Sequence, residues 1–115
     1  MSVVIYHNPR CSKSRETLAL LEGRGIHPRV IEYLKTPPTA AELKTLLAKL
    51  RLKPRDLMRK KEAVYAELGL DDAKLTDDAL IKAMAANPIL IERPIVVNGS
   101  KATLGRPPEA ALAIL

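Results

Sequence analysis

The chain has 115 residues, of which 47% are hydrophobic and 28% charged. These values are typical of one globular domain with one modest core. No apolar run approaches the roughly 18 residues of a membrane helix, and the start, Met-Ser-Val-Val-Ile, lacks the features of a signal peptide. We therefore expect a cytoplasmic protein with no membrane partner. The net charge of +6 favours anionic partners, but aromatic residues that stack on bases are scarce, which argues against nucleic acid and leaves a small oxyanion.

The first part of the chain is predicted to form a β-α-β unit. A β-branched run covers Val3–Tyr6, and a helical pattern runs from Ser14 to about Gly23. A second strand is expected over Arg29–Leu34. Because a helix joins the two strands within about 30 residues, they should be parallel.

The middle of the chain is predicted to be helical. Thr39 and Glu42 form a capping box before an apolar face that ends at Leu50. Further helices are expected over residues 54–59, 62–68 and, after a Thr76 cap, 76–86. Residues 39–87, approximately, therefore form a helical insertion.

The last part returns to strand. Ile95–Val97 and Ala102–Leu104 flank Asn98-Gly99, which is a strong hairpin signal. Pro108 suits the first turn of a final helix, Glu109–Leu115. The order predicts an α/β protein in which residues 1–115 form a single domain with a mixed four-stranded sheet. This is the thioredoxin-like fold with a helical insertion.

Cys11 is the one cysteine of the sequence, so no intrachain disulfide can form. It lies between the first predicted strand and the helix that follows. Unpaired N–H groups and the helix dipole favour a thiolate there, and the nearby cations Arg10, Lys13 and Arg15 act in the same direction. The alternative is an inert buried thiol that packs as a small hydrophobe.

Five segments occur in an order that resembles a known family. They are Tyr6–Arg15, Tyr33–Pro38, Leu57–Lys61, Asn87–Val97 and Gly105–Glu109. Together they resemble the glutaredoxin-linked (ArsC-like) arsenate reductases of the thioredoxin-like superfamily, including the short bacterial members. The resemblance covers essentially the whole chain, and the cysteine segment and the Glu-Arg-Pro-Ile-Val-Val segment are specific in combination.

The resemblance implies a role for each matching position. Cys11 is the expected nucleophile, and Arg59, Arg93 and Arg106 are the expected oxyanion binders, because a guanidinium gives two aligned hydrogen bonds to such an anion. Arg93 and Arg106 adjoin prolines at strand boundaries, where functional loops gather. Arg59 precedes two lysines, so a solvated basic helix face is the alternative for it.

Two further side chains are candidates for supporting the thiolate. His7 would act as a nearby cation or hydrogen-bond donor, although an ordinary hydrogen-bonded loop histidine is nearly as good an interpretation. The resemblance suggests that Ser14 donates to the thiolate, and capping of the helix start is its alternative role. We also predict a cis Arg93–Pro94 bond, because thioredoxin-like folds place a cis-proline before the strand that faces the cysteine.

The resemblance also implies the reaction and its partners. Cys11 attacks arsenate, glutathione attacks the adduct as a co-substrate, and glutaredoxin reduces the mixed disulfide. No bound metal or resident cofactor is expected. Two alternatives remain: a glutathione-dependent thiol reductase with another substrate, and a redox-responsive regulator that binds RNA polymerase. Such regulators typically carry Cys-x-x-Cys, whereas the fourth position here is Ser14.

Overall fold

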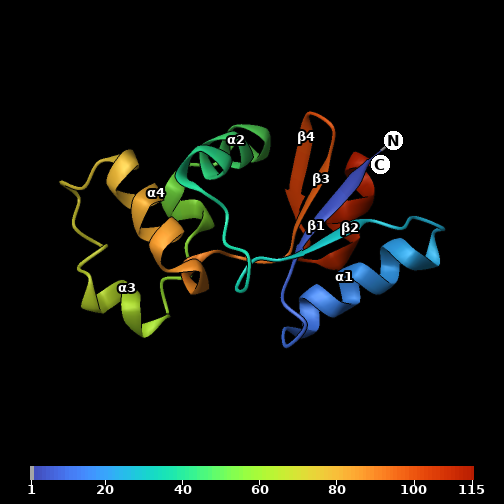
Figure 1. Ribbon diagram of the computed structural model, residues 1–115, viewed down its shortest axis with the longest axis horizontal. Coiled ribbons are helices and arrows are strands. Elements are labelled where there is room, and N and C mark those ends of the chain that lie inside the picture. Colours follow the sequence, from blue (N-terminus) through green and yellow to red (C-terminus); the bar gives the residue numbers. More distant parts are fainter. Residues whose placement is uncertain (1) are drawn as a thin grey trace. The chain divides into compact units, whose positions relative to one another are not determined.

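The computed structural model describes residues 2–115, and it divides the chain into two compact units (Figure 1). The first unit contains the residues up to Thr36 together with Arg93–Leu115, and the second is Pro37–Glu92. The second unit is helical and extends a few residues beyond the predicted insertion at each end. Within the described residues, no helix is long and apolar enough to cross a membrane.

The first unit carries a mixed four-stranded sheet, which confirms the predicted α/β class. Its strands are β1 (Val3–His7), β2 (Arg29–Glu32), β3 (Ile95–Asn98) and β4 (Lys101–Leu104), in the order β2-β1-β3-β4. As predicted, β1 and β2 are parallel, whereas β3 runs antiparallel to both β1 and β4. The hairpin turn places Gly99 at a φ of 62°, which glycine adopts without strain.

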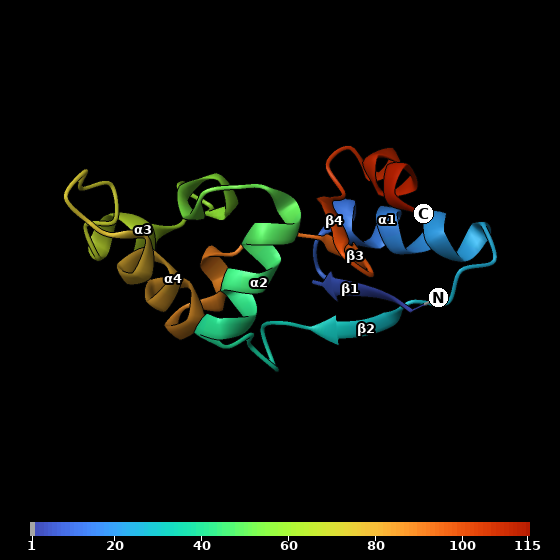
Figure 2. The same cartoon turned by 90° about the horizontal axis from the view of Figure 1, so that it is seen from above.

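One face of this sheet is covered by α1 (Ser12–Gly23) and by the C-terminal 3₁₀ helix (Pro108–Ile114), which pack against each other (Figure 2). The core between them is apolar. It consists of Val3, Ile5, Leu21, Val96 and Ala111. Because every side chain in this cluster is buried, its packing fixes the position of α1 against the strands.

Three predicted elements of the first unit differ from the structure. The first helix begins at Ser12 rather than at Ser14. The second strand ends at Glu32 rather than at Leu34, because the carbonyl of Glu32 accepts the N–H groups of both Lys35 and Thr36 and so turns the chain. The final element is a 3₁₀ helix that begins at Pro108, where an α-helix over 109–115 was predicted.

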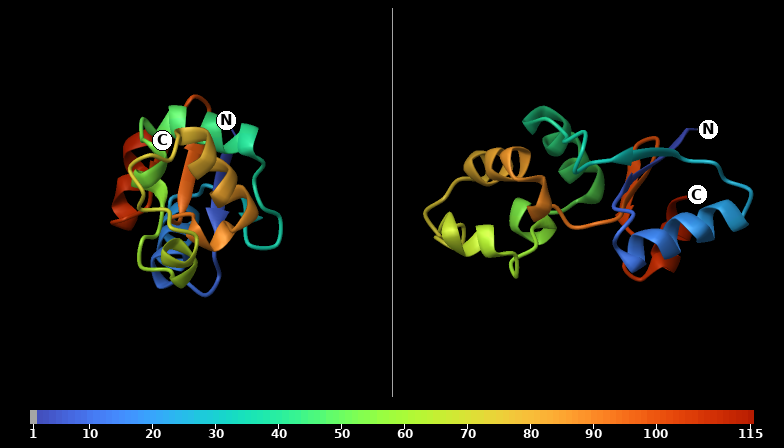
Figure 3. Two further views of the ribbon diagram at one scale, coloured as in Figure 1. Left: turned by 90° about the vertical axis from the view of Figure 1, so that its left-hand side faces the viewer. Right: turned by 60° about the horizontal axis from the view of Figure 1, so that its bottom comes forward.

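The second unit contains α2 (Ala40–Leu50), α3 (Ala63–Glu67) and α4 (Asp77–Ala86), with short 3₁₀ helices at Pro54–Leu57 and Pro88–Leu90. The helices α2 and α4 pack against each other (Figure 3). The Thr39–Glu42 capping box is formed as predicted. The apolar faces of α2 and α4 are buried except at Leu50, which is half-buried.

Gly105, which directly follows β4, lies against Thr17 of α1 and against Pro94, which precedes β3. Thr17, which is fully buried on α1, donates to the Gly105 carbonyl at 3.3 Å and to that of Lys13 at 2.8 Å. The Gly105 N–H donates to the Pro94 carbonyl at 2.9 Å. A Cβ atom at position 105 would lie 2.5 Å from Thr17 Oγ1 and 2.8 Å from Pro94 Cγ. Only glycine fits this contact.

The predicted cis peptide bond at Arg93–Pro94 is confirmed, and Arg106–Pro107 is also cis. The second of these bonds was not predicted. Both flank the Gly105 contact, since Pro94 follows Arg93 and Arg106 follows Gly105 along the chain.

Substitution Gly105→Ala should lower the free energy of unfolding by about 1–3 kcal/mol, because the added methyl overlaps buried atoms on two sides. Gly23→Ala is the matched control, since nothing lies within 4 Å of a Cβ there. Denaturant titration measures both variants. Equal stabilities for the two variants would contradict the close approach at position 105.

Candidate active site

Cys11 is the N-cap residue of α1, at the end of a tight turn that follows β1. Its N–H donates to the Asn8 carbonyl at 3.0 Å, and Asn8 Oδ1 accepts the Arg10 N–H at 2.9 Å. Asn8 is buried, so these bonds hold the turn from inside. The thiol itself is partly exposed, which leaves it accessible at a helix N-terminus.

The pKa of Cys11 is lowered by its surroundings. Burial raises this pKa, but a hydrogen bond from the Arg93 guanidinium, the backbone N–H of Ser14, the charge of Arg93 and the backbone N–H of Lys13 together outweigh burial. The sulfur makes no capping hydrogen bond of ordinary geometry, yet both N–H groups still favour the anion. The site therefore stabilises the thiolate, which is the nucleophilic form.

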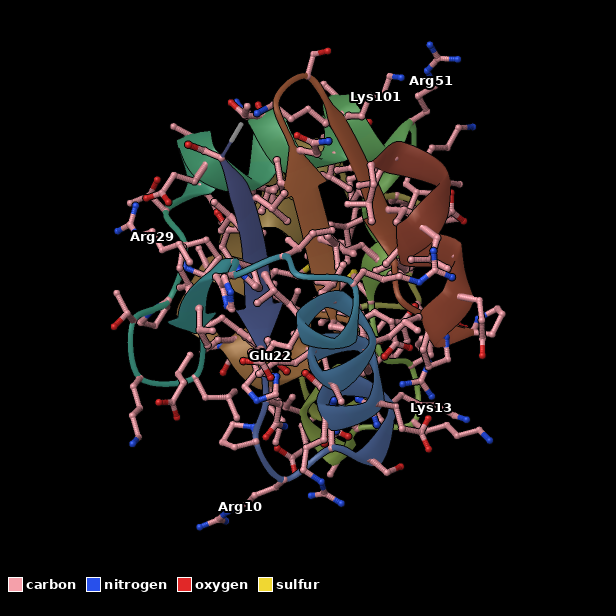
Figure 4. The ribbon with its side chains drawn as sticks, turned by 90° about the vertical axis from the view of Figure 1, so that its right-hand side faces the viewer. Arg10, Lys13, Glu22, Arg29, Arg51 and Lys101 are labelled. Atoms are coloured by element: carbon pink, nitrogen blue, oxygen red, sulfur yellow. The ribbon has the colours of Figure 1, made fainter. Side chains whose placement is uncertain are left out.

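The cation that stabilises the thiolate is Arg93, and not the loop cations that the sequence suggested. Lys13 pairs with Glu16 at 3.4 Å, and Arg15 donates to the Pro9 carbonyl at 2.9 Å. Arg10 and Lys13 project outward from the start of α1 (Figure 4). This part of the sequence interpretation is corrected, because neighbours along the chain need not point at the sulfur.

His7 and Ser14 form a buried network behind the turn. His7 Nδ1 lies 2.6 Å from Ser14 Oγ, which also accepts the Asn8 N–H at 3.0 Å. Burial lowers the pKa of His7, a nearby Glu32 carboxylate opposes this shift, and Arg15 adds to it. His7 is therefore neutral at neutral pH.

These contacts favour the hydrogen-bonded loop histidine as the interpretation of His7, and donation by the Ser14 hydroxyl to the thiolate stays a prediction. His7 bonds to Ser14 rather than acting as a cation at the sulfur. The Ser14 hydroxyl is engaged by His7 and Asn8, and it is the backbone N–H of Ser14 that favours the thiolate. Both residues nevertheless lie beside Cys11 and fix the turn that presents it.

Two of the predicted oxyanion binders meet at the sulfur. Arg106 Nη1 lies 4.0 Å from Cys11 Sγ and donates to the Arg93 carbonyl at 3.2 Å. Arg93 itself hydrogen-bonds the thiol. Arg93 is half-buried, so its guanidinium is held by the protein, whereas Arg106 is exposed and its guanidinium faces solvent. This arrangement can bind a tetrahedral oxyanion against the thiolate.

Arg59 lies in the second unit, where two carboxylates hold its guanidinium. Its Nη1 is 2.8 Å from Glu92 Oε1, and its Nε is 3.5 Å from Glu62 Oε2. The Arg59 side chain is 24% exposed, whereas Lys60 and Lys61 are exposed. Arg59 is thus an ion-paired residue rather than part of a solvated basic run, and its part in oxyanion binding stays a prediction.

Thr17 and Gly105 were not predicted as site residues, yet they join α1 to the segments that carry the two arginines. Gly105 directly precedes Arg106, and its N–H is bound by the residue after Arg93. The Gly-Arg-Pro-Pro run was a signal for a constrained turn, but only the fold shows that Thr17 is its partner. Among the described residues, no group of three or more His, Cys, Asp or Glu could hold a metal ion.

The rate of Cys11 alkylation should rise with pH, because the thiolate is the reactive form. The midpoint of this rise should lie below the pKa of roughly 8.5 of an ordinary cysteine, because the pKa of Cys11 is lowered. Arg93→Ala should move this midpoint upward, because both the hydrogen bond and the charge of Arg93 favour the anion. Lys13→Ala is the control: it keeps the backbone N–H and should leave the midpoint in place. A wild-type midpoint at or above 8.5 rules out an activated thiol.

Comparison with known proteins places the chain among relatives of matching length. It is 52% identical over 116 residues to an arsenate reductase of Haemophilus influenzae, with 100% of both chains covered. It is 53% identical to an arsenate reductase of Neisseria meningitidis, covering 98% of this chain and 97% of that protein.

A solved structure and a family description agree with these relatives. The structure of an arsenate reductase from Vibrio cholerae superposes with a TM-score of 0.98 at 62% identity, covering 100% of this chain and 98% of that one. The description of the ArsC family matches residues 6–114. The two arginines converge on the cysteine at the edge of the expected thioredoxin-like sheet, in agreement with these matches. The chain therefore belongs to the ArsC family.

Proposed function

We propose that this protein reduces arsenate to arsenite, with Cys11 as the nucleophile and Arg93 and Arg106 as oxyanion ligands. The observation that carries the proposal is the convergence of both guanidinium groups on a thiol whose pKa is lowered. Arsenate is a tetrahedral oxyanion, and the arginines would bind its oxygens while the sulfur faces the arsenic. Several relatives of similar length are named arsenate reductases, which supports the same substrate.

The proposed reaction begins when the Cys11 thiolate attacks arsenic. A sulfur–arsenic bond forms, and one arsenate oxygen leaves as water after protonation. The two arginines stabilise the charge on the remaining oxygens, and their positions are set before the substrate binds. His7 is neutral and hydrogen-bonded to Ser14, so it would hold the turn rather than carry charge.

Release of arsenite requires two electrons from an external thiol, because Cys11 is the chain's one cysteine. A glutathione thiolate would attack Cys11 Sγ, so that a sulfur–sulfur bond forms as the sulfur–arsenic bond breaks. The bonding pair stays on arsenic, which passes from the pentavalent to the trivalent state. Glutaredoxin would then reduce the mixed disulfide and return the Cys11 thiolate. These are cytoplasmic partners, in keeping with the expected compartment.

Purified protein with glutathione and glutaredoxin should form arsenite from arsenate, and Cys11→Ser should abolish this activity, since a serine hydroxyl is not ionised at neutral pH. Ser12→Ala, at an exposed neighbouring position, is the control and should retain turnover. Thiol transfer to other disulfides without arsenite formation would instead identify a glutathione-dependent thiol reductase. Absence of both activities would exclude both the arsenate reductase and the thiol reductase.

Arg93→Lys and Arg106→Lys should each lower kcat/KM for arsenate by about tenfold to a hundredfold, because lysine keeps the charge but loses the paired hydrogen bonds worth about 1.5–3 kcal/mol. Arg29→Lys, on an exposed position of β2, is the matched control and should retain full activity. Circular dichroism checks that the variants fold. If both site variants turn over arsenate like the wild type, the two arginines do not bind the substrate.

A further inference from the structure

A cavity of about 200 Å³ opens beside the Cys11 turn. Its walls are the loop His7–Arg10 and, from the end of β2 onward, Glu32, Leu34 and Lys35. It therefore lies where the parallel strands β1 and β2 end.

The walls of this cavity carry two cations and one carboxylate. Arg10 is exposed, and its guanidinium has no hydrogen-bonded or ion-paired partner among the described residues. Lys35 Nζ lies 3.6 Å from Glu32 Oε1, and both side chains are well exposed, at 78% and 42%. Such an exposed pair contributes little to stability, so these three charges are available to a ligand.

The cavity and the arginine pair lie on opposite sides of the Cys11 turn. The sheet order β2-β1-β3-β4 places β1 between β2 and β3. Arg93 is separated from the start of β3 by Pro94, and Arg106 is separated from the end of β4 by Gly105. The cavity, in contrast, is built from the end of β2 and the loop after β1. The oxyanion and a second molecule can therefore reach the cysteine from different sides.

We propose that this cavity binds the thiol co-substrate, a short thiol peptide with two carboxylates and one ammonium group, as in glutathione. Arg10 and Lys35 would each pair with a carboxylate, and Glu32 with the ammonium. This inference rests on the proposed function. Arg10, which lines the cavity, directly precedes Cys11 in the chain, and an extended tripeptide spans about 10 Å.

The test is a double variant, Arg10→Gln with Lys35→Gln, compared with Arg29→Gln with Lys101→Gln. The control pair also removes two exposed positive charges from the first unit, at positions outside the cavity (Figure 4). The probe is S-methylglutathione, which cannot react, and its Kd is measured by NMR titration. Loss of two exposed charge pairs should raise this Kd about tenfold in the cavity variant and leave it unchanged in the control.

Turnover gives a second readout on the same variants. The ratio of KM for glutathione to KM for mercaptoethanol should rise about tenfold in the cavity variant only, because mercaptoethanol has no carboxylates to bind. Glu32→Gln should weaken the binding of S-methylglutathione more than the binding of an analogue that lacks the amino group, because Glu32 is proposed to pair with the ammonium group.

Equal Kd values for the cavity variant and wild type would overturn the proposal, as would an equal loss in the control pair. If no thiol supports arsenite formation, the proposed reaction fails on its own, and the NMR titration still decides whether the cavity binds the thiol peptide.

Discussion

The chemistry of this protein depends on keeping a partly buried sulfur negatively charged. Burial by itself favours the neutral thiol, and the structure reverses that preference with donors from two directions. The N–H groups of Ser14 and Lys13 come from the start of α1, while Arg93 comes from the segment before β3. The first set is positioned locally, because Cys11 is the N-cap of α1, whereas Arg93 comes from a distant part of the sequence. Their meeting depends on how α1 packs against the sheet.

That packing is fixed by a contact that leaves no free space. Thr17 reaches across to the Gly105 carbonyl, and Gly105 in turn bonds to Pro94. The atoms are so close that a side chain at position 105 would overlap them. Since Arg93 and Arg106 are direct neighbours of Pro94 and Gly105, this buried contact fixes the backbone from which both arginine side chains extend toward Cys11. A rigid support of this kind keeps the charged groups in place before any substrate arrives.

The charges around the cysteine are distributed unevenly, and this asymmetry suits a reaction of two substrates. The guanidinium groups of Arg93 and Arg106 lie toward β3 and β4, where an oxyanion would bind. Exposed and weakly paired charges line the cavity toward β2. The buried network between His7, Ser14 and Asn8 is uncharged at neutral pH and holds the turn between these two regions. The cysteine therefore has a structural support that does not compete for the anion.

Local signals in the sequence determined most of the fold. The β-α-β pattern, the capping box at Thr39 and the β3–β4 hairpin are each decided by nearby residues, and all three are formed. The hairpin turn itself is Gly99-Ser100 rather than the predicted Asn98-Gly99, because Asn98 is still paired with Lys101 in the strands. The ends of elements were less accurate. The second strand stops early because the Glu32 carbonyl accepts two N–H groups, and such competition between hydrogen bonds leaves no clear pattern in the sequence.

The sequence by itself also placed Cys11 at a helix start and singled out Arg93 and Arg106. Only the tertiary structure decided which cation meets the sulfur, that the Ser14 hydroxyl turns to His7, and that Arg59 is paired with carboxylates. The physical reason is that hydrogen bonds and charge interactions act over a few ångströms in space. Residues adjacent along the chain point to different sides, whereas residues far apart in sequence are brought together by packing.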